Sequence, residues 1–256
     1  MTGIIFRSAG AGPAVLLLHA FPLNAAMWSS QMSTLDDSGM LLAPDLPGFG
    51  ASGQADVTED LDVLAKIVYE ECRSRGVEDA LVVGCSMGGY LAFALLRVAA
   101  QFVRGLALIN TKASADTDQA RANRLALADR VERDGPGFLV DEWPRSALSP
   151  LTMLQQPDIV QSVQDMIRQA TARGVMAAQR AMAKRPDSTP LLGAIRVPTA
   201  VIHGSDDTII AEVQARAMAD AIAGATFVAI PAAGHLPNLE QPSAVNGVLR
   251  SLFTKG

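Results

Sequence analysis

The sequence has little of several residue types on which whole classes of protein depend. Its 256 residues include two cysteines, three histidines and 5% aromatic residues. The two cysteines, Cys72 and Cys85, do not provide a disulfide framework, and no spacing of cysteine and histidine matches a metal site. We therefore expect a protein that holds no metal and needs no cofactor.

Long apolar runs and clusters of basic residues are also absent. No apolar run approaches the roughly 20 residues that a membrane-spanning helix needs, and residues 1–7 lack a basic region followed by a long apolar stretch. The net charge is −5, and lysine and arginine do not cluster among aromatic residues, which argues against nucleic-acid binding. We expect a cytoplasmic protein with neither a nucleic-acid nor a membrane partner.

Apolar residues, by contrast, make up 49% of the chain, and they alternate between strand-like and helical patterns. Strand-like runs are expected near residues 14–19, 40–44, 80–85, 105–110, 198–203 and 225–230. Helical patterns lie between them, near residues 25–36, 58–75, 87–100, 211–223 and 241–253. This alternation predicts an α/β fold with a mostly parallel sheet covered by helices on both faces. One further strand is expected at residues 4–7.

The stretch from residue 111 to residue 195 breaks the alternation. It contains no strand-like run, and its helical segments are separated by Gly135-Pro136-Gly137 and by single prolines. We expect a core of residues 1–110 and 196–256, with residues 111–195 inserted as a helical cap, or lid, that supplies pocket walls. Trp143, Phe138 and Met153 are the candidates for the substrate pocket.

Charged residues in this cap recur at spacings of three and four, which predicts solvent-exposed ion pairs along a helix face. The residues are Arg121, Arg124, Arg130 and Arg133, with Asp129, Glu132 and Asp134.

A serine flanked by glycines gives the strongest indication of chemistry. Gly84-Cys85-Ser86-Met87-Gly88 follows the apolar residues 80–83 and precedes a stretch rich in helix formers. Glycines two residues before and after the serine let the chain turn sharply from strand to helix without Cβ clashes. The turn would leave the hydroxyl of Ser86 exposed, and we predict that Ser86 is a nucleophile. Cys85 is expected to be a buried small hydrophobe.

A serine nucleophile needs a histidine to take its proton and a carboxylate to orient that histidine. His19 and His203 each end an apolar run, whereas His235 lies in a Gly/Pro loop after a late apolar stretch. We therefore predict that His235 is the base. Asp206 and Asp207 lie together on the turn after His203, and only one of them is needed.

Five motifs occur in order along nearly the whole chain. They are Leu18-His19-Ala20-Phe21-Pro22, Pro44-Asp45-Leu46-Pro47-Gly48-Phe49-Gly50-Ala51-Ser52, the serine turn, His203-Gly204-Ser205-Asp206-Asp207, and Gly234-His235 with Glu240-Gln241-Pro242. The chain thereby resembles the α/β-hydrolases, in particular the cofactor-free group that includes 3-oxoadipate enol-lactonases, small carboxylesterases and serine-type haloperoxidases or perhydrolases. The order of serine, aspartate and histidine along the chain is also that of the α/β-hydrolases.

The resemblance implies roles for particular residues. It selects Asp207 as the acid, since the family's acid stands three residues after the glycine of that motif, and it leaves Asp206 as a turn residue. It also implies an oxyanion hole formed by the backbone N–H groups of Phe21 and Met87. Ala20 stands where the family usually has glycine, although Phe21 keeps its N–H.

The serine at position 86 excludes several reactions that other proteins of this fold catalyse. Dehalogenases and epoxide hydrolases need an aspartate there, and dienelactone hydrolases use a cysteine. The resemblance implies a serine hydrolase with the catalytic triad Ser86, Asp207 and His235, which cleaves small-molecule carboxylic esters with small to medium, mainly apolar acyl groups through an acyl-enzyme. The alternative is a 3-oxoadipate enol-lactonase-like lactone hydrolase. C–C hydrolases and perhydrolases share the triad, and a weakly hydrolytic ligand sensor is a further hypothesis.

Overall fold

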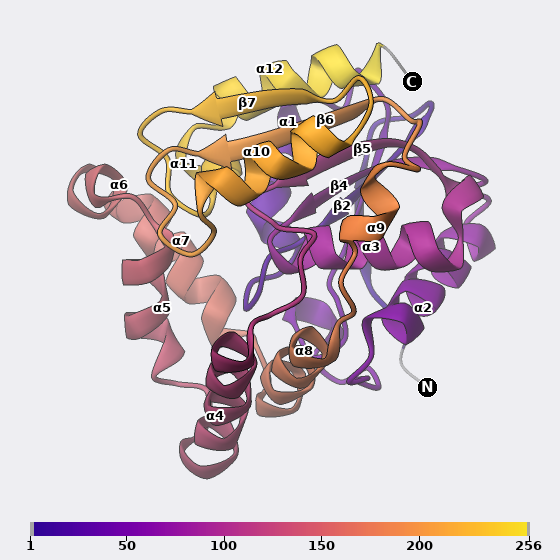
Figure 1. The fold of residues 1–256 in the computed structure, drawn as a ribbon. Coiled ribbons are helices and arrows are strands. Elements are labelled where there is room, and N and C mark those ends of the chain that lie inside the picture. Colours follow the sequence, from indigo (N-terminus) through magenta and orange to yellow (C-terminus); the bar gives the residue numbers. More distant parts are fainter. Residues whose placement is uncertain (1–2, 255–256) are drawn as a thin grey trace.

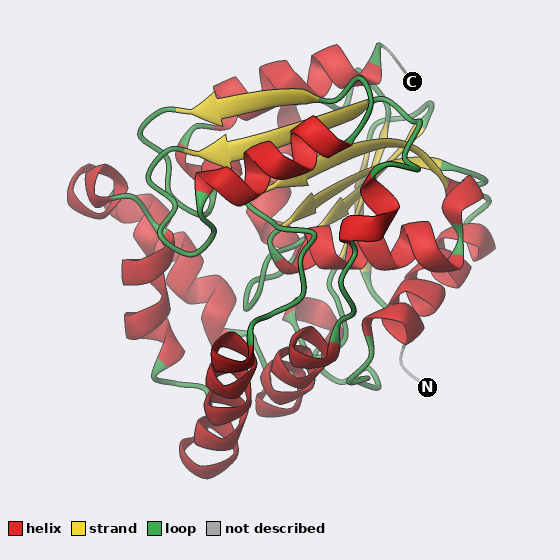
Figure 2. Ribbon diagram, in the orientation of Figure 1, coloured by secondary structure: helices red, strands yellow, loops and turns green. Residues whose placement is uncertain are grey.

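A seven-stranded sheet forms the centre of the computed structural model, which describes residues 3–254 (Figures 1 and 2). The strands are β1 (Phe6–Ala9), β2 (Ala14–Leu18), β3 (Met40–Pro44), β4 (Ala80–Cys85), β5 (Val103–Ile109), β6 (Thr199–Gly204) and β7 (Thr226–Ile230). Their order in the sheet is β1-β3-β2-β4-β5-β6-β7, in which β1 pairs antiparallel with β3 and every other pair is parallel. Met1 and Thr2, part of the segment expected to lack a targeting signal, lie outside the described residues.

The central strands are mostly apolar because both faces of the sheet are covered. Every residue of β2, β4 and β6 is buried, as is usual for parallel strands with helices on either side. The predicted α/β fold is therefore confirmed. The six predicted strands lie within two residues of those in the structure, and the strand expected at residues 4–7 is β1, two residues further along.

Helices of the core pack on both faces of this sheet. They are η1 (Ala25–Trp28), α1 (Ser29–Thr34), η2 (Gly50–Ser52), α2 (Leu61–Ser74), α3 (Met87–Val98), η3 (Ala100–Phe102), α10 (Glu212–Ala221), α11 (Pro237–Glu240) and α12 (Pro242–Phe253). Helices α1 and α12 lie on one face, and α2, α3 and α10 lie on the other (Figure 1). In α2 the buried side chains recur every three or four residues, and Asp60 caps the first turn by accepting from the amide of Asp62.

Helices between β5 and β6 form a separate layer. They are α4 (Asp118–Asp134), α5 (Leu139–Ala147), α6 (Pro150–Gln155), α7 (Pro157–Arg168) and α8 (Ala172–Lys184), followed by the short α9 (Thr189–Leu192), which contacts α10. Helix α4 packs along α8, and α5 packs against α7, beyond the carboxyl ends of the parallel strands (Figure 1). Pro150 and Pro157 begin α6 and α7, where a missing N–H costs nothing, whereas Pro144 lies inside α5. Within residues 3–254, no helix has the length and apolar character needed to cross a membrane.

This layer touches the core at Gly48, in the second motif. The Gly48 carbonyl accepts hydrogen bonds from the N–H and the hydroxyl of Thr171, at 2.9 and 3.0 Å. A Cβ on Gly48 would lie 2.2 Å from Cα of Gly174 in α8, and the φ angle of Gly48 is +89°. Both constraints favour glycine, and its small size lets α8 lie directly on the core loop.

The ion pairs of α4 differ from the predicted pattern. They are Arg121–Asp118, Arg124–Asp116, Arg130–Glu142 and Arg133–Asp134. The prediction of pairs at spacings of three and four with Asp129, Glu132 and Asp134 is therefore wrong. Helix α4 packs against other segments, so that Arg130 reaches α5 and Arg124 reaches the loop before α4, while Glu132 pairs with Arg180 of α8.

Candidate active site

Ser86 lies on a sharp turn between β4 and α3. Its φ and ψ angles are 53° and −111°, a backbone conformation that is rare for a residue with a side chain. A Cβ on Gly84 would lie 2.3 Å from the Gly88 carbonyl oxygen, and a Cβ on Gly88 would lie 2.1 Å from the Leu18 carbonyl oxygen. The two glycines are thus required by close backbone contacts, while the strained conformation belongs to the serine itself.

Asp207 and His235 form a buried pair at the ends of β6 and β7. His235 Nδ1 donates to Asp207 Oδ2 at 2.9 Å, and the two side chains are 1% and 0% exposed. The other carboxylate oxygen of Asp207 accepts from the amides of Ile209 and Ile210. Asp206 instead contacts the exposed hydroxyl of Ser205. The structure therefore brings Asp207, and not Asp206, to the histidine.

A cavity of about 320 Å³ lies between Ser86, His235 and helices that follow β5. It is lined by Ser86 and His235, by the apolar Phe21, Ala120, Leu127, Trp143, Met182, Ile209 and Ile210, and by Tyr90, Lys112, Asp116, Asn123, Arg124 and Gln179. The lining of the cavity is therefore partly apolar and partly polar and charged. A larger cavity of about 460 Å³ lies between β6, β7 and α12 and contains none of the predicted site residues.

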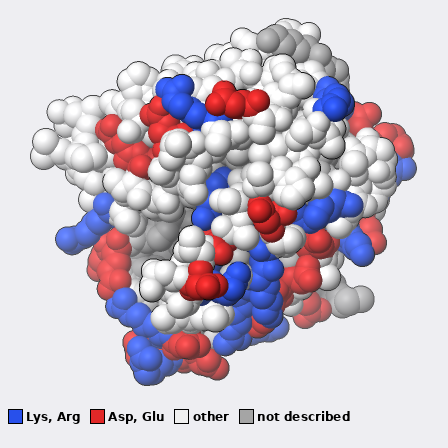
Figure 3. Space-filling view, viewed as in Figure 1, with Lys and Arg blue, Asp and Glu red and all other residues white. Residues whose placement is uncertain are grey.

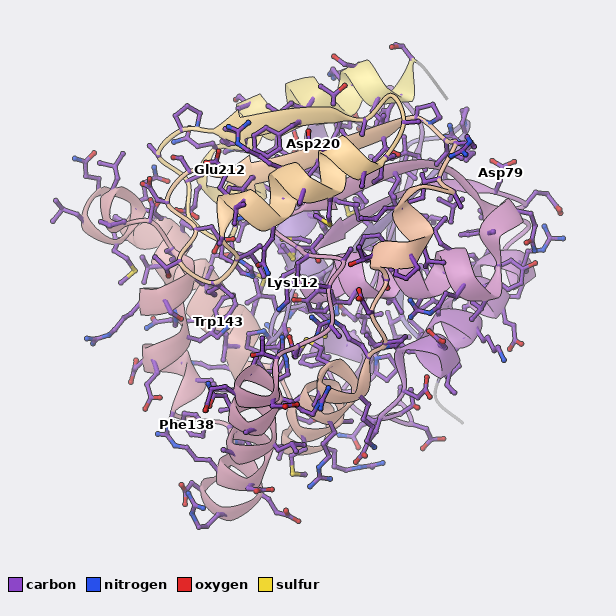
Figure 4. All side chains as sticks on the ribbon, viewed as in Figure 1. Asp79, Lys112, Phe138, Trp143, Glu212 and Asp220 are labelled. Carbon is purple, nitrogen blue, oxygen red and sulfur yellow. The ribbon has the colours of Figure 1, made fainter. Side chains whose placement is uncertain are left out.

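Of the three pocket candidates, Trp143 alone lines the cavity beside Ser86. The ring of Phe138 lies at the start of α5 with the guanidinium of Arg130 3.5 Å from its centroid, and Met153 packs on the core from α6. Figure 4 shows Phe138 at the far end of α5 from the sheet, with Trp143 closer to it. The position of α5 thus determines which of its aromatic residues reaches the cavity.

The backbone amides of Phe21 and Met87 are free to bind a ligand. Neither amide donates a hydrogen bond to another residue within 3–254, and Phe21 lines the cavity. Ala20, which replaces the usual glycine, is fully buried, and its N–H contacts the sulfur of Met27 at 3.2 Å while its carbonyl accepts from Leu23. The loop therefore accommodates the Cβ of Ala20. The Phe21 N–H still donates no hydrogen bond to another described residue.

The family comparison covers most of the chain. The model of the alpha/beta hydrolase family matches residues 15–248. The chain belongs to this family. Among curated relatives, 3-oxoadipate enol-lactonase 2 from Acinetobacter baylyi is 24% identical over 243 residues, which cover 95% of this chain and 89% of the relative.

Two solved structures are similar to this α/β hydrolase over almost its full length. A thermophilic esterase from Thermogutta terrifontis, solved with malate bound, is 38% identical, with a TM-score of 0.95 and coverage of 98% of this chain and 93% of the esterase. The enol-lactonase from Burkholderia xenovorans LB400 is 25% identical, with a TM-score of 0.90 and coverage of 98% and 96%. These relatives support a hydrolase that acts on small molecules.

His19 holds the loop that carries the Phe21 amide in this α/β hydrolase. Its Nδ1 donates to the Ala20 carbonyl at 3.0 Å, and its Nε2 accepts from the Leu46 amide at 3.0 Å. The bond from Leu46 requires an unprotonated Nε2, so the ring is neutral. Burial lowers the pKa of His19 to about 4, against the opposing effects of the Ala20 hydrogen bond and the charge of Asp45.

This neutral histidine should make stability depend on pH. An unfolded histidine titrates near 6.5, so between pH 6.5 and 4 the unfolded chain holds a proton that folded His19 does not, and stability falls as pH falls. We expect this to cost about 2.5 kcal/mol of unfolding free energy between pH 7 and pH 4.5. Urea unfolding at both pH values should show this loss in the wild type and a loss smaller by that amount in His19→Asn. Equal losses in the two proteins would contradict the role of His19.

Two buried residues not among the predicted site residues position the His235 loop. Asn110, at φ 43°, donates to the Gly234 carbonyl at 2.7 Å and accepts from the Gly204 amide at 2.8 Å. Glu240 accepts from the amides of Gly234 and of Ser149, which precedes α6. Asn110 follows β5 directly, and asparagine tolerates a positive φ angle. An asparagine directly after an apolar strand is therefore the sequence signal that could have indicated this residue.

The charged residues of the cavity lining were also not predicted as site residues from the sequence. Asp116, 1% exposed, forms ion pairs with Lys112 at 3.2 Å, with Arg185 at 2.9 Å and with Arg124. Figure 4 shows Lys112 between the sheet and α4, and Figure 3 shows basic side chains in the same region. Burial raises the pKa of Asp116, but the hydrogen bonds and charges of Arg185 and Arg124 hold it well below its usual range. The carboxylate is therefore charged.

Proposed function

We propose that this α/β hydrolase is a serine hydrolase that cleaves carboxylic esters of small to medium acyl groups through an acyl-enzyme. The observation that carries the proposal is the buried pair of His235 and Asp207 at one cavity with Ser86. The bond from Nδ1 to Asp207 fixes the tautomer in which Nε2 is unprotonated and able to accept a proton. The 38% identity to an esterase over 98% of the chain gives independent support.

The proposed reaction follows from the placement of these groups. Ser86 Oγ attacks the ester carbonyl and gives its proton to His235 Nε2, while Asp207 stabilises the cationic ring. The amides of Phe21 and Met87 bind the oxyanion, and each such donor typically contributes about 3–4 kcal/mol to the barrier reduction. His235 then protonates the leaving alcohol. Water, deprotonated by the same histidine, hydrolyses the acyl-enzyme and regenerates Ser86.

The size of the cavity and the position of the cap limit the substrate. A volume of about 320 Å³ is at the lower end of the usual range for ligand sites and suits a small acyl group. Leu127, Trp143 and Ile210 supply an apolar surface for its methylene groups. We propose that residues 111–195 act as a lid over a core of residues 1–110 and 196–256, since α4, α5 and α8 provide walls of the cavity.

A series of p-nitrophenyl esters from acetate to decanoate tests this proposal. We expect the highest kcat/KM for short acyl chains, because longer ones exceed the cavity while the cap stays in place. An optimum at decanoate would contradict the proposed pocket size. Turnover of none of these esters, together with turnover of the lactone below, would contradict the esterase assignment.

Lactone hydrolysis is the second candidate and uses the same groups. It is favoured by the two 3-oxoadipate enol-lactonases of Acinetobacter baylyi among the relatives, at 24% and 29% identity. In a lactone the leaving alcohol remains attached to the acyl group. Measurement of kcat/KM for 3-oxoadipate enol-lactone against methyl and ethyl esters separates the candidates, because a lactonase prefers the lactone and an esterase the open-chain esters.

A further inference from the structure

We propose that Lys112 and Arg124 form an anion subsite in the cavity, so that the natural substrates carry a carboxylate in addition to the ester or lactone group. This inference rests on the proposed function, because it assigns the substrate class of the same site. The subsite would bind a short acyl chain whose far end is a carboxylate. Its evidence is a charge imbalance beside Ser86.

The charge imbalance is centred on Asp116, which forms ion pairs with three cationic side chains. Arg185 neutralises Asp116 away from the cavity, since it is 4% exposed and its guanidinium also donates to the carbonyls of Met182 and Ser114, both at 2.9 Å. Arg185 does not line the cavity, and its guanidinium stacks on the ring of Tyr90 with its carbon 3.9 Å from the centroid. Arg185 and Asp116 thus form a buried ion pair with no net charge.

Lys112 and Arg124 remain as two cations that line the cavity, with Asp116 as the acid among the lining residues. Lys112 has Asp116 as its ion-pair partner and is 13% exposed. Arg124 bonds Asp116 through Nε, while its Nη1 has distant acceptors at 3.4 Å, Gln179 Oε1 and Met182 Sδ. Excess positive charge in a partly desolvated pocket is stabilised by an anion, and ammonium and guanidinium groups both donate strong hydrogen bonds to carboxylates.

The position of the two cations sets where the carboxylate would lie. Thr111 donates its hydroxyl to the Ser86 carbonyl at 2.9 Å, so the next residue, Lys112, leaves the sheet beside the nucleophile. Arg124 comes from α4 and bonds the same Asp116 carboxylate as Lys112, so the two cations lie close together in the cavity lining. An ester bound at Ser86 would therefore extend its acyl chain past the apolar side chains and place a terminal carboxylate beside Lys112 and Arg124.

Two isosteric esters test the subsite. Monomethyl glutarate carries the carboxylate, and methyl 5-methylhexanoate has an isopropyl group in its place. We expect the wild type to have a kcat/KM at least about tenfold higher for the glutarate ester, and this ratio to fall about tenfold in Lys112→Met. Raising the salt concentration should also lower the ratio. Arg133→Met is the matched control, because Arg133 lies on α4, is 67% exposed and pairs with Asp134 outside the cavity.

The outcomes separate the subsite from the proposed function. A wild-type ratio of one or less, or a ratio that Lys112→Met leaves unchanged, would overturn the subsite while ester hydrolysis itself stands. If neither ester is cleaved, calorimetric titration with glutarate tests the subsite alone. Binding to the wild type that weakens about tenfold in Lys112→Met and stays unchanged in Arg133→Met supports the subsite. Absence of binding, or equal binding to all three proteins, overturns it.

Discussion

Replacement of Ser86 by alanine is expected to lower kcat for ester hydrolysis by about 10⁴- to 10⁶-fold. The variant keeps the cavity, His235 and the two free amides but has no oxygen to form the acyl-enzyme. Because alanine at φ 53° meets the same backbone restriction as serine, the fold should persist, with a melting temperature close to that of the wild type. The measurement is kcat for the best p-nitrophenyl ester, with both proteins at equal concentration.

Ser33→Ala is the control for this substitution, because Ser33 lies on α1 and is exposed. It should retain wild-type kcat. A Ser86→Ala protein that is folded and keeps more than about one hundredth of the wild-type kcat would show that another group attacks the substrate.

Replacement of Asp207 by asparagine should lower kcat by about 10³- to 10⁴-fold. The amide of asparagine would donate to His235 Nδ1, which forces the ring into the tautomer with a proton on Nε2. In that tautomer His235 cannot accept the proton of Ser86. The loss should be in kcat, with KM changed little, since the Asp207 side chain is fully buried and Asp207 does not line the cavity.

Asp206→Asn provides a matched control on the adjacent residue. It makes the same chemical change on the same turn, but the Asp206 side chain is exposed and contacts Ser205. We expect less than a twofold change in kcat. A larger loss in Asp206→Asn than in Asp207→Asn would contradict the pairing of Asp207 with His235.

The sequence predicted the sheet well because its strands are nearly uniform apolar runs. Residues 80–85 and 40–44 were placed at the bounds of β4 and β3, where burial on both faces leaves little ambiguity. The proposed roles of Ser86 and His235 were predicted from local turns that contain glycine. The choice of Asp207 over Asp206 depended on the resemblance, since two adjacent acids on one turn have the same local signal.

The helices between β5 and β6 were less predictable because their contacts join segments that are distant along the chain. Helical spacing suggested that Arg124 pairs on its own helix face, whereas it reaches Asp116, eight residues earlier and outside α4. Phe138 and Trp143 are both aromatic and both on or beside α5, and only the packing of α5 decides that Trp143 lines the cavity. Spacing rules describe a single helix, and they do not include the neighbouring elements that set these contacts.

Covalent labelling of Ser86 by an organophosphate is the most direct test of the proposed nucleophile. Diethyl p-nitrophenyl phosphate reacts with an activated serine, releases p-nitrophenolate and leaves a diethylphosphoryl group that water removes slowly. We expect one equivalent of p-nitrophenolate per chain, parallel loss of esterase activity, and the added mass on the peptide that contains Ser86. Ser86→Ala should release none in the same time. Full inhibition with the label on another residue, or rapid ester turnover by an enzyme that takes up no label, would contradict a mechanism based on Ser86.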